Sequence, residues 1–229
     1  FLEELQVPIY KIASFEINDI PLIEYVASKK KPLIISTGIA TLSDIEEAIQ
    51  ACHRHNNNNI TLLKCTSSYP APVEHANLRT IPNMAETFGM KVGLSDHTMG
   101  HAVAVAAVAL GASVIEKHFI LDRSIGGPDA SFSMTPEEFK VMVDEIRTAE
   151  KALGNISYQL SESDLKSKEF SRSLFITENI RKGDKLTDNN IRSVRPAFGL
   201  HTRHYKDVLG RTASYDLKKG MPLKWEMIS

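Results

Sequence analysis

The sequence has too few cysteines, too little net charge and too short apolar runs for several classes of protein. Its two cysteines, Cys52 and Cys65, cannot form the disulfide framework of a small secreted domain, so a reducing cytoplasm is the expected compartment. A net charge of -1 argues against nucleic acid as the main partner. No apolar run approaches the roughly 20 residues that cross a membrane. The acidic start, residues 1–5, differs from the basic start of a signal peptide.

Common catalytic and nucleotide-binding motifs are also missing. The chain contains no Gly-x-Gly-x-x-Gly, no phosphate-loop lysine motif, no Cys-x-x-Cys and no arguable Ser-His-Asp set. It also lacks an initiator Met and opens in what resembles the last turns of a helix. We therefore expect an N-terminal part of a longer protein to precede it.

Apolar runs alternate with amphipathic stretches through the first two thirds of the chain. This pattern predicts βαβ units and a parallel sheet. Thr41 and Thr135, each followed by early acidic residues, are good helix N-caps. The expected strands are residues 9–14, 32–37, 60–65, 91–94 and 113–118, and the expected helices are 19–28, 42–53, 77–88, 101–110 and 136–153. Five units form either an open sheet or part of an eight-stranded barrel with about three units upstream, and the abrupt start favours the barrel.

Composition changes after Gly154. We expect a catalytic domain over residues 1–156, a polar linker over 157–171 and a compact, mostly β module over 172–229 with a short helix near 205–209. One expectation for this module is that it binds a carbohydrate or a partner on its own.

Two histidines follow neighbouring predicted strands. His97 closes Gly93-Leu94-Ser95-Asp96-His97, and His118 closes Ile115-Glu116-Lys117-His118. Adjacent parallel strands end on the same side of a sheet, where α/β active sites gather, so the two imidazoles can share one metal. Such a site would stay open to substrate and suits Mn²⁺, Fe²⁺ or Zn²⁺. The alternative is two histidines with purely structural partners.

Hydroxyl and ammonium groups end the other strands and can form a phosphate or carboxylate site. A lysine in a buried strand is costly without an anion, so Lys11 is either an anion ligand or a surface residue. Glu16 is a candidate general acid or base, an orienter of Lys11, or a plain loop carboxylate. Arg123 and Asp129 lie in a loop long enough to fold over a site. The candidate donors are Lys11, Ser14, Ser36, Lys64, Thr66, Ser67, Tyr69 and Ser95.

Taken in order, these segments resemble the sialic acid synthase family, which condenses phosphoenolpyruvate with an open-chain amino sugar. The resemblance covers nearly the whole chain. Its segments are Tyr10-Lys11-Ile12-Ala13-Ser14, Ile35-Ser36-Thr37-Gly38, Lys64-Cys65-Thr66-Ser67-Ser68-Tyr69-Pro70, Gly93-Leu94-Ser95-Asp96-His97-Thr98, Glu116-Lys117-His118-Phe119, Gly127-Pro128-Asp129 and Ser193-Val194-Arg195-Pro196.

The resemblance implies strands four to eight of a (β/α)₈ TIM barrel, followed by a small SAF (antifreeze-like) domain. It implies that His97 and His118 bind a divalent metal, Mn²⁺ or Mg²⁺. It further implies a domain-swapped homodimer, in which Arg195 enters the partner's barrel to contact the sugar. It places Lys11, Ser14, Ser36 and Ser95 at phosphoenolpyruvate, Ser67 where the family commonly has Asn, and Glu16, Tyr69 and Asp129 near the sugar or the reacting centre.

Within the family, two segments are similar to the pseudaminic acid synthases: Lys64-Cys65-Thr66-Ser67, and Arg195-Pro196 followed by Phe198-Gly199-Leu200-His201. The sugar would then be 2,4-diacetamido-2,4,6-trideoxy-L-altrose, which has no 6-hydroxyl, and Phe198 would suit its less polar pocket. The alternatives are an N-acetylneuraminate or legionaminic acid synthase, or a non-catalytic fragment that only binds phosphoenolpyruvate.

Overall fold

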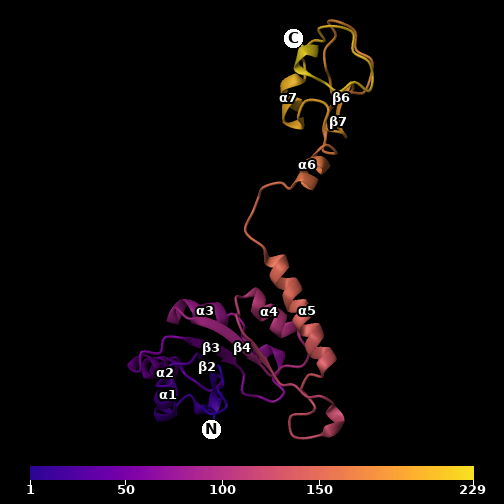
Figure 1. Ribbon diagram of the computed structural model, residues 1–229. Coiled ribbons are helices and arrows are strands. Elements are labelled where there is room, and N and C mark those ends of the chain that lie inside the picture. The colour runs from indigo at the N-terminus through magenta and orange to yellow at the C-terminus, as the bar shows by residue number, and fades with distance from the viewer. The chain divides into compact units, whose positions relative to one another are not determined.

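Strands and helices alternate through the first of two structural units in the computed structural model, which describes residues 1–229 (Figure 1). The units are residues 1–155 and 156–229. All five strands of the first unit pair in parallel and in chain order. The elements are β1 (Tyr10–Ile12), α1 (Ile20–Ala27), β2 (Leu33–Ser36), α2 (Leu42–Arg54), β3 (Ile60–Cys65), α3 (Thr80–Phe88), β4 (Lys91–Asp96), α4 (Ala102–Ala109), β5 (Ile115–Lys117) and α5 (Pro136–Leu153).

The register of the sheet sorts its side chains into two faces. Cys65 lies opposite Ser95, and Ser95 lies opposite Glu116. Because side chains alternate along a strand, these three residues share one face. The other face carries apolar residues such as Ile35 and Leu62, which form the main core with α1, α2 and α3. The helices therefore cover one face, and the polar strand ends lie on the other.

Helix starts follow the sequence closely. Thr41 and Thr135 accept hydrogen bonds from the backbone N–H groups of Asp44 and Glu138, and each acidic side chain returns a bond to the cap residue. These capping boxes fix where α2 and α5 begin. The end of α3 is marked in a similar way. Gly89 ends this helix in the left-handed conformation, which glycine adopts without strain.

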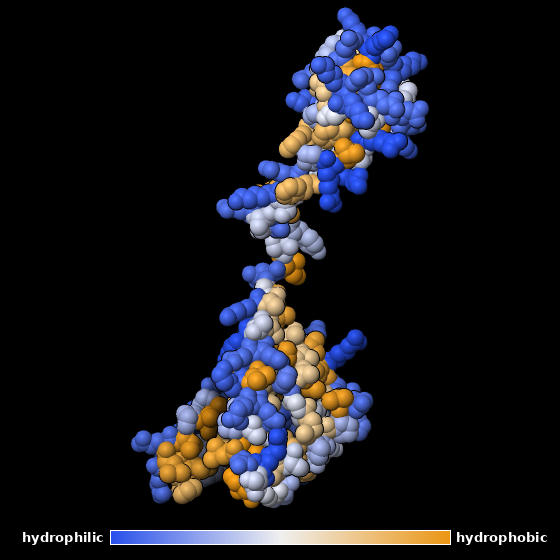
Figure 2. Space-filling view, turned by 90° about the vertical axis from the view of Figure 1, so that its right-hand side faces the viewer, coloured by the Kyte–Doolittle hydropathy of each residue, from blue (hydrophilic) through white to orange (hydrophobic).

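The second unit has a core of its own. Its elements are α6 (Glu162–Lys168), β6 (Ser173–Ile176), β7 (Ile191–Val194) and α7 (Tyr205–Val208), with β6 and β7 antiparallel. Leu174, Ile176, Ile191 and Leu223 are buried together. Figure 2 shows mainly hydrophilic residues over the visible surface of this unit.

One local expectation was wrong. Residues 2–6 form turns instead of the end of a helix, although one N–H of Leu5 reaches the carbonyl of Phe1 at 3.1 Å. Within the expected polar linker, residues 157–171, the structure places α6, which begins at a capping box on Ser161. No helix has the length and apolarity needed to cross a membrane.

Candidate active site

The two histidines meet as the strand order predicts. His97 follows β4 and His118 follows β5, and their ring centroids lie 5.1 Å apart. Tyr69 lies close to both rings, tilted against His97 and edge-on to His118, with its centroid 4.3 Å from that of His97 and 5.9 Å from that of His118. The strand ends thus form one cluster of two imidazoles and a phenol.

The backbone sets the tautomer of His97. Its Nδ1 lies 2.9 Å from the carbonyl oxygen of Thr66. Since a carbonyl can only accept, Nδ1–H is the donor, and the neutral ring keeps its lone pair on Nε2. A ring fixed in this way by a carbonyl is typical of metal-binding histidines.

His118 lies between a carboxylate and an aromatic ring. Its Nδ1 is 3.6 Å from Oδ2 of Asp129, and its centroid is 5.1 Å from that of Phe132. Burial and the neighbouring His97 lower the pKa of His118, which favours the neutral imidazole. Phe132 was not among the expected site residues, because a phenylalanine in a loop carries no signal in a single sequence.

A hollow of about 170 Å³ adjoins the histidines and gathers most of the expected polar residues. The hydroxyl oxygens of Ser36 and Ser67 are buried and have no hydrogen-bond partner. A buried polar atom without a partner is costly, so two of them together indicate a ligand with acceptor oxygens. The hollow is lined by Lys11, Ala13, Ser14, Phe15, Ser36, Cys65, Tyr69, Ser95, His97, Glu116 and His118.

Gly38 leaves room for the hydroxyl groups of Ser14 and Ser67. A Cβ at this position would lie 2.2 Å from Oγ of Ser67 and 2.8 Å from Oγ of Ser14. The N–H of Gly38 instead donates to Ser14 at 3.1 Å. Any larger residue at position 38 would push the hydroxyls apart.

Glu116 is the main residue that the sequence prediction left without a role. Its carboxylate accepts a 2.6 Å hydrogen bond from Ser95 and lies 3.4 Å from Nζ of Lys11. It therefore connects the hydroxyl group of β4 with the ammonium group of β1. Its position directly opposite Ser95 in the sheet is the signal that could have found it.

Cys65 is the other unexpected lining residue. Its Sγ lies 3.9 Å from Nδ1 of His97. Burial raises the pKa of this thiol, but hydrogen bonds with His97, Ser14 and Ser95 outweigh burial and hold the pKa below its usual value.

Other expected site residues have the following surroundings. Glu16 accepts a 2.8 Å hydrogen bond from the N–H of Ala13, whereas the ion pair of Lys11 is with Glu116. Lys64 donates to the carbonyl of Cys65 at 2.8 Å, and burial lowers its pKa, but it does not line the hollow. Arg195 and Phe198 are exposed residues of the second unit.

The donor set fits a divalent metal with open coordination positions. His97 and His118 supply two nitrogens, and no group of three or more His, Cys, Asp or Glu gathers to complete a closed site. Two imidazoles with oxygen donors suit Mn²⁺ better than Mg²⁺, which prefers all-oxygen octahedral sites.

Comparisons with known proteins agree on one family. A model described as the NeuB family matches residues 1–158, and a SAF domain model matches residues 171–229. The pseudaminic acid synthase of Helicobacter pylori is 49% identical over 97% of this chain, and the N,N'-diacetyllegionaminic acid synthase of Campylobacter jejuni is 40% identical over 95%. The chain spans about two thirds of these relatives, 66% of each.

A solved structure shows the same architecture. The spore coat polysaccharide biosynthesis protein SpsE from Bacillus subtilis matches 100% of this chain with 69% of its own, at a TM-score of 0.64 and 36% identity. The expected fold, the last five strands of a TIM barrel followed by an SAF domain, is confirmed. On the family match over residues 1–158 and the parallel half-barrel that carries it, the chain belongs to the NeuB family.

Proposed function

We propose that the protein condenses phosphoenolpyruvate with 2,4-diacetamido-2,4,6-trideoxy-L-altrose, giving pseudaminic acid and phosphate, as part of surface polysaccharide biosynthesis. The observation that carries the proposal is the unpartnered hydroxyl of Ser36 in a hollow shared with two imidazoles, with a second unpartnered hydroxyl, that of Ser67, close to Gly38. The sugar is assigned from the 49% identity to a pseudaminic acid synthase, against 40% to a legionaminic acid synthase.

The hydroxyl side of the hollow would hold phosphoenolpyruvate. Lys11 and the hydroxyls of Ser14, Ser36 and Ser67 offer one charge and several donors to a phosphate or carboxylate group. Binding the anion would satisfy Ser36 and Ser67 and would offer Lys11 a partner besides Glu116.

The histidine side would hold the sugar aldehyde. His97 and His118 would hold a divalent metal, which supplies Lewis-acid polarisation of a carbonyl when bound. Tyr69, Asp129 and Phe132 surround these rings and would orient the sugar there. The reaction joins C3 of phosphoenolpyruvate to the aldehyde carbon, adds water at C2 and expels phosphate by C–O cleavage. Holding both substrates in one hollow would supply much of the acceleration.

Phosphate release tests this function. The chain is incubated with phosphoenolpyruvate, Mn²⁺ and either the altrose-type sugar or N-acetylmannosamine, with a chelator-treated sample beside each. We expect release with the altrose-type sugar, loss of release with the chelator, and recovery when Mn²⁺ is added in excess.

Other results of the phosphate-release assay would favour a different function or contradict the proposal. Release only with N-acetylmannosamine would move the assignment to the sialic type. Phosphoenolpyruvate binding without release from either sugar would contradict the proposal and favour a binding fragment. Full phosphate release in the presence of the chelator would contradict the proposed requirement for a divalent metal.

A further inference from the structure

The loop between β5 and α5 is attached to the site at its base. The N–H of Met134 donates to the carbonyl of His118, and the N–H of Ile120 donates to the carbonyl of Met134, each at 2.9 Å. Phe119 and Met134 form a parallel bridge. The two ends of the loop are therefore held together directly beside His118.

The outer part of this loop has no core of its own. Residues 121–129 are all exposed, and Gly126 and Gly127 turn the chain with φ of 75° and 109°. Yet the same loop brings Asp129 to 3.6 Å from Nδ1 of His118, and Phe132 to a centroid distance of 5.1 Å from the same ring. Without buried side chains, hydrogen bonds must hold the outer part in place.

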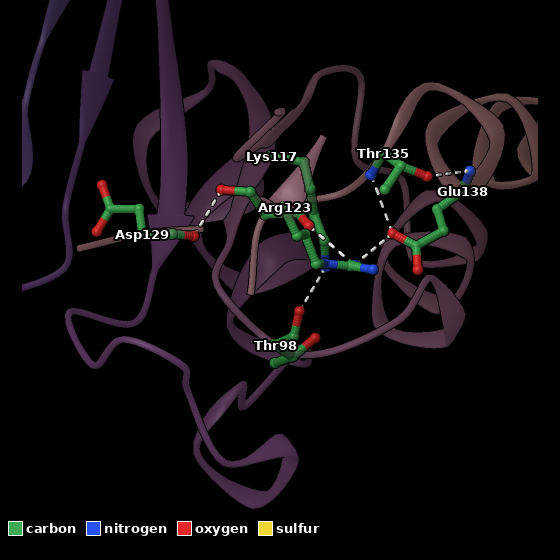
Figure 3. Close-up of polar contacts among 7 residues, drawn as sticks. Thr98, Lys117, Arg123, Asp129, Thr135 and Glu138 are labelled. Carbon is green, nitrogen blue, oxygen red and sulfur yellow. Dashed lines mark hydrogen bonds and ion pairs between the residues drawn. The ribbon is translucent and has the colours of Figure 1, made fainter. Parts of the chain in front are cut away.

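Arg123 makes those bonds (Figure 3). Its Nη2 donates to the carbonyl of Ser133 at 2.9 Å and to the carboxylate of Glu138, the residue of the α5 capping box. Ser133 in turn donates its hydroxyl to the carbonyl of Asp129 at 2.7 Å. Arg123 and Asp129 are the only side chains of residues 121–129 that bond outside that stretch.

We propose that Arg123 is a positioning residue that holds Asp129 and Phe132 against His118 and so orients the sugar rather than phosphoenolpyruvate. The chain of contacts runs from Glu138 through Arg123 and Ser133 to Asp129. Glu138 is itself fixed by its bond to the N–H of Thr135, so the anchor is the rigid start of a helix. This inference rests on the proposed function.

Its kinetic signature follows from where the loop lies. The groups assigned to phosphoenolpyruvate come from the segments at and after β1, β2 and β3 and from Ser95 on β4, and none of them contacts Arg123. Releasing the loop should therefore change the handling of the sugar and leave that of phosphoenolpyruvate alone. A small displacement of orienting groups costs roughly 10- to 100-fold in rate.

The test compares Arg123→Met with Arg147→Met. Arg147 lies on α5 in an exposed 2.7 Å ion pair with Glu150, so the control removes the same type of side chain without touching the loop. In Arg123→Met we expect kcat/KM for the sugar to fall roughly 10- to 100-fold, with KM for phosphoenolpyruvate within about twofold of wild type. Arg123→Lys, which keeps one ammonium donor, should recover part of the loss.

Hydrogen exchange gives a readout that needs no turnover. Amides of residues 119–134 should exchange faster in Arg123→Met, while those of β3 and β4 and the melting temperature match the Arg147→Met control. Unchanged exchange and unchanged sugar kinetics, in a preparation whose wild type releases phosphate, would overturn the inference. So would an equal loss for both substrates. A wild type that releases no phosphate contradicts the proposed function instead, and the exchange comparison still decides whether Arg123 holds the loop.

Discussion

The buried hydroxyls of Ser36, which lines the hollow, and of Ser67 are the features that most directly favour a ligand there. Each hydroxyl is buried without a partner, which costs about 1–3 kcal/mol in the free protein. In Ser36→Ala we therefore expect the free energy of unfolding to stay unchanged or to rise by about 1 kcal/mol. KM for phosphoenolpyruvate should rise at the same time, because the hydroxyl is proposed to meet the substrate anion. Urea unfolding and phosphate-release kinetics measure the two quantities.

The next residue supplies the matched control. Thr37 is buried, and its hydroxyl donates to the carbonyl of Leu63 at 2.9 Å. Thr37→Val keeps the shape and should lower the free energy of unfolding by about 1 kcal/mol, with KM unchanged. If Ser36→Ala were as destabilising as Thr37→Val and left KM unaltered, Ser36 would be a structural residue.

Single residues were predicted well where strand position alone decides their place. His97, His118, Ser36 and Ser95 were expected at strand ends and line one hollow. The role of Glu116 was missed, because its significance comes from its neighbours in the sheet, Ser95 and Lys11, which are far away in the sequence.

At the scale of elements, β4 and β5 are joined by a buried ion pair on the face away from the hollow. Nζ of Lys117 lies 2.7 Å from Oδ2 of Asp96 and donates to the carbonyl of Thr98 at 2.6 Å; Figure 3 shows the latter contact. The two side chains are 2% and 1% exposed. Asp96 also accepts bonds from the N–H and hydroxyl of Thr98. The pair thus fixes the backbone on both sides of His97 and next to His118.

Lys117→Met should destabilise the first unit strongly, by about 3–5 kcal/mol, because it leaves Asp96 charged and buried. Adding Asp96→Asn should recover most of this loss, since the amide oxygen still accepts from Thr98. Urea unfolding measures both. Lys140→Met, which breaks an exposed pair with Asp144 on α5, is the control and should cost at most about 1 kcal/mol. If Lys117→Met were no less stable than this control, the buried ion pair would not stabilise the first unit as predicted.

Elements were predictable where local chemistry marks them. The capping boxes at Thr41 and Thr135 identified the starts of α2 and α5. The β7 strand was not expected, because its four residues, Ile191–Val194, alternate too briefly to stand out. The α6 helix was missed for a related reason: all of its residues are exposed, so it has no apolar face to reveal it.

At the scale of the molecule, each unit carries its own buried core, so the chain reads as two folding units. Chain order predicted the parallel sheet, because each βα unit places the next strand beside the last. It does not indicate whether the exposed Arg195 contacts a second copy, because such a contact would leave no periodic pattern in one sequence. The domain-swapped homodimer therefore stays a prediction.

Complementation between two inactive variants tests that prediction. His97→Ala is expected to disable the first unit, and Arg195→Ala to disable the contribution of the second. In a swapped dimer each site combines the first unit of one subunit with the second unit of its partner. A heterodimer of the two variants, isolated with two different tags, would then contain one fully intact site and should show about half of the wild-type rate. If the subunits are not exchanged, both sites of the heterodimer carry a defect and the rate stays at that of the inactive homodimers.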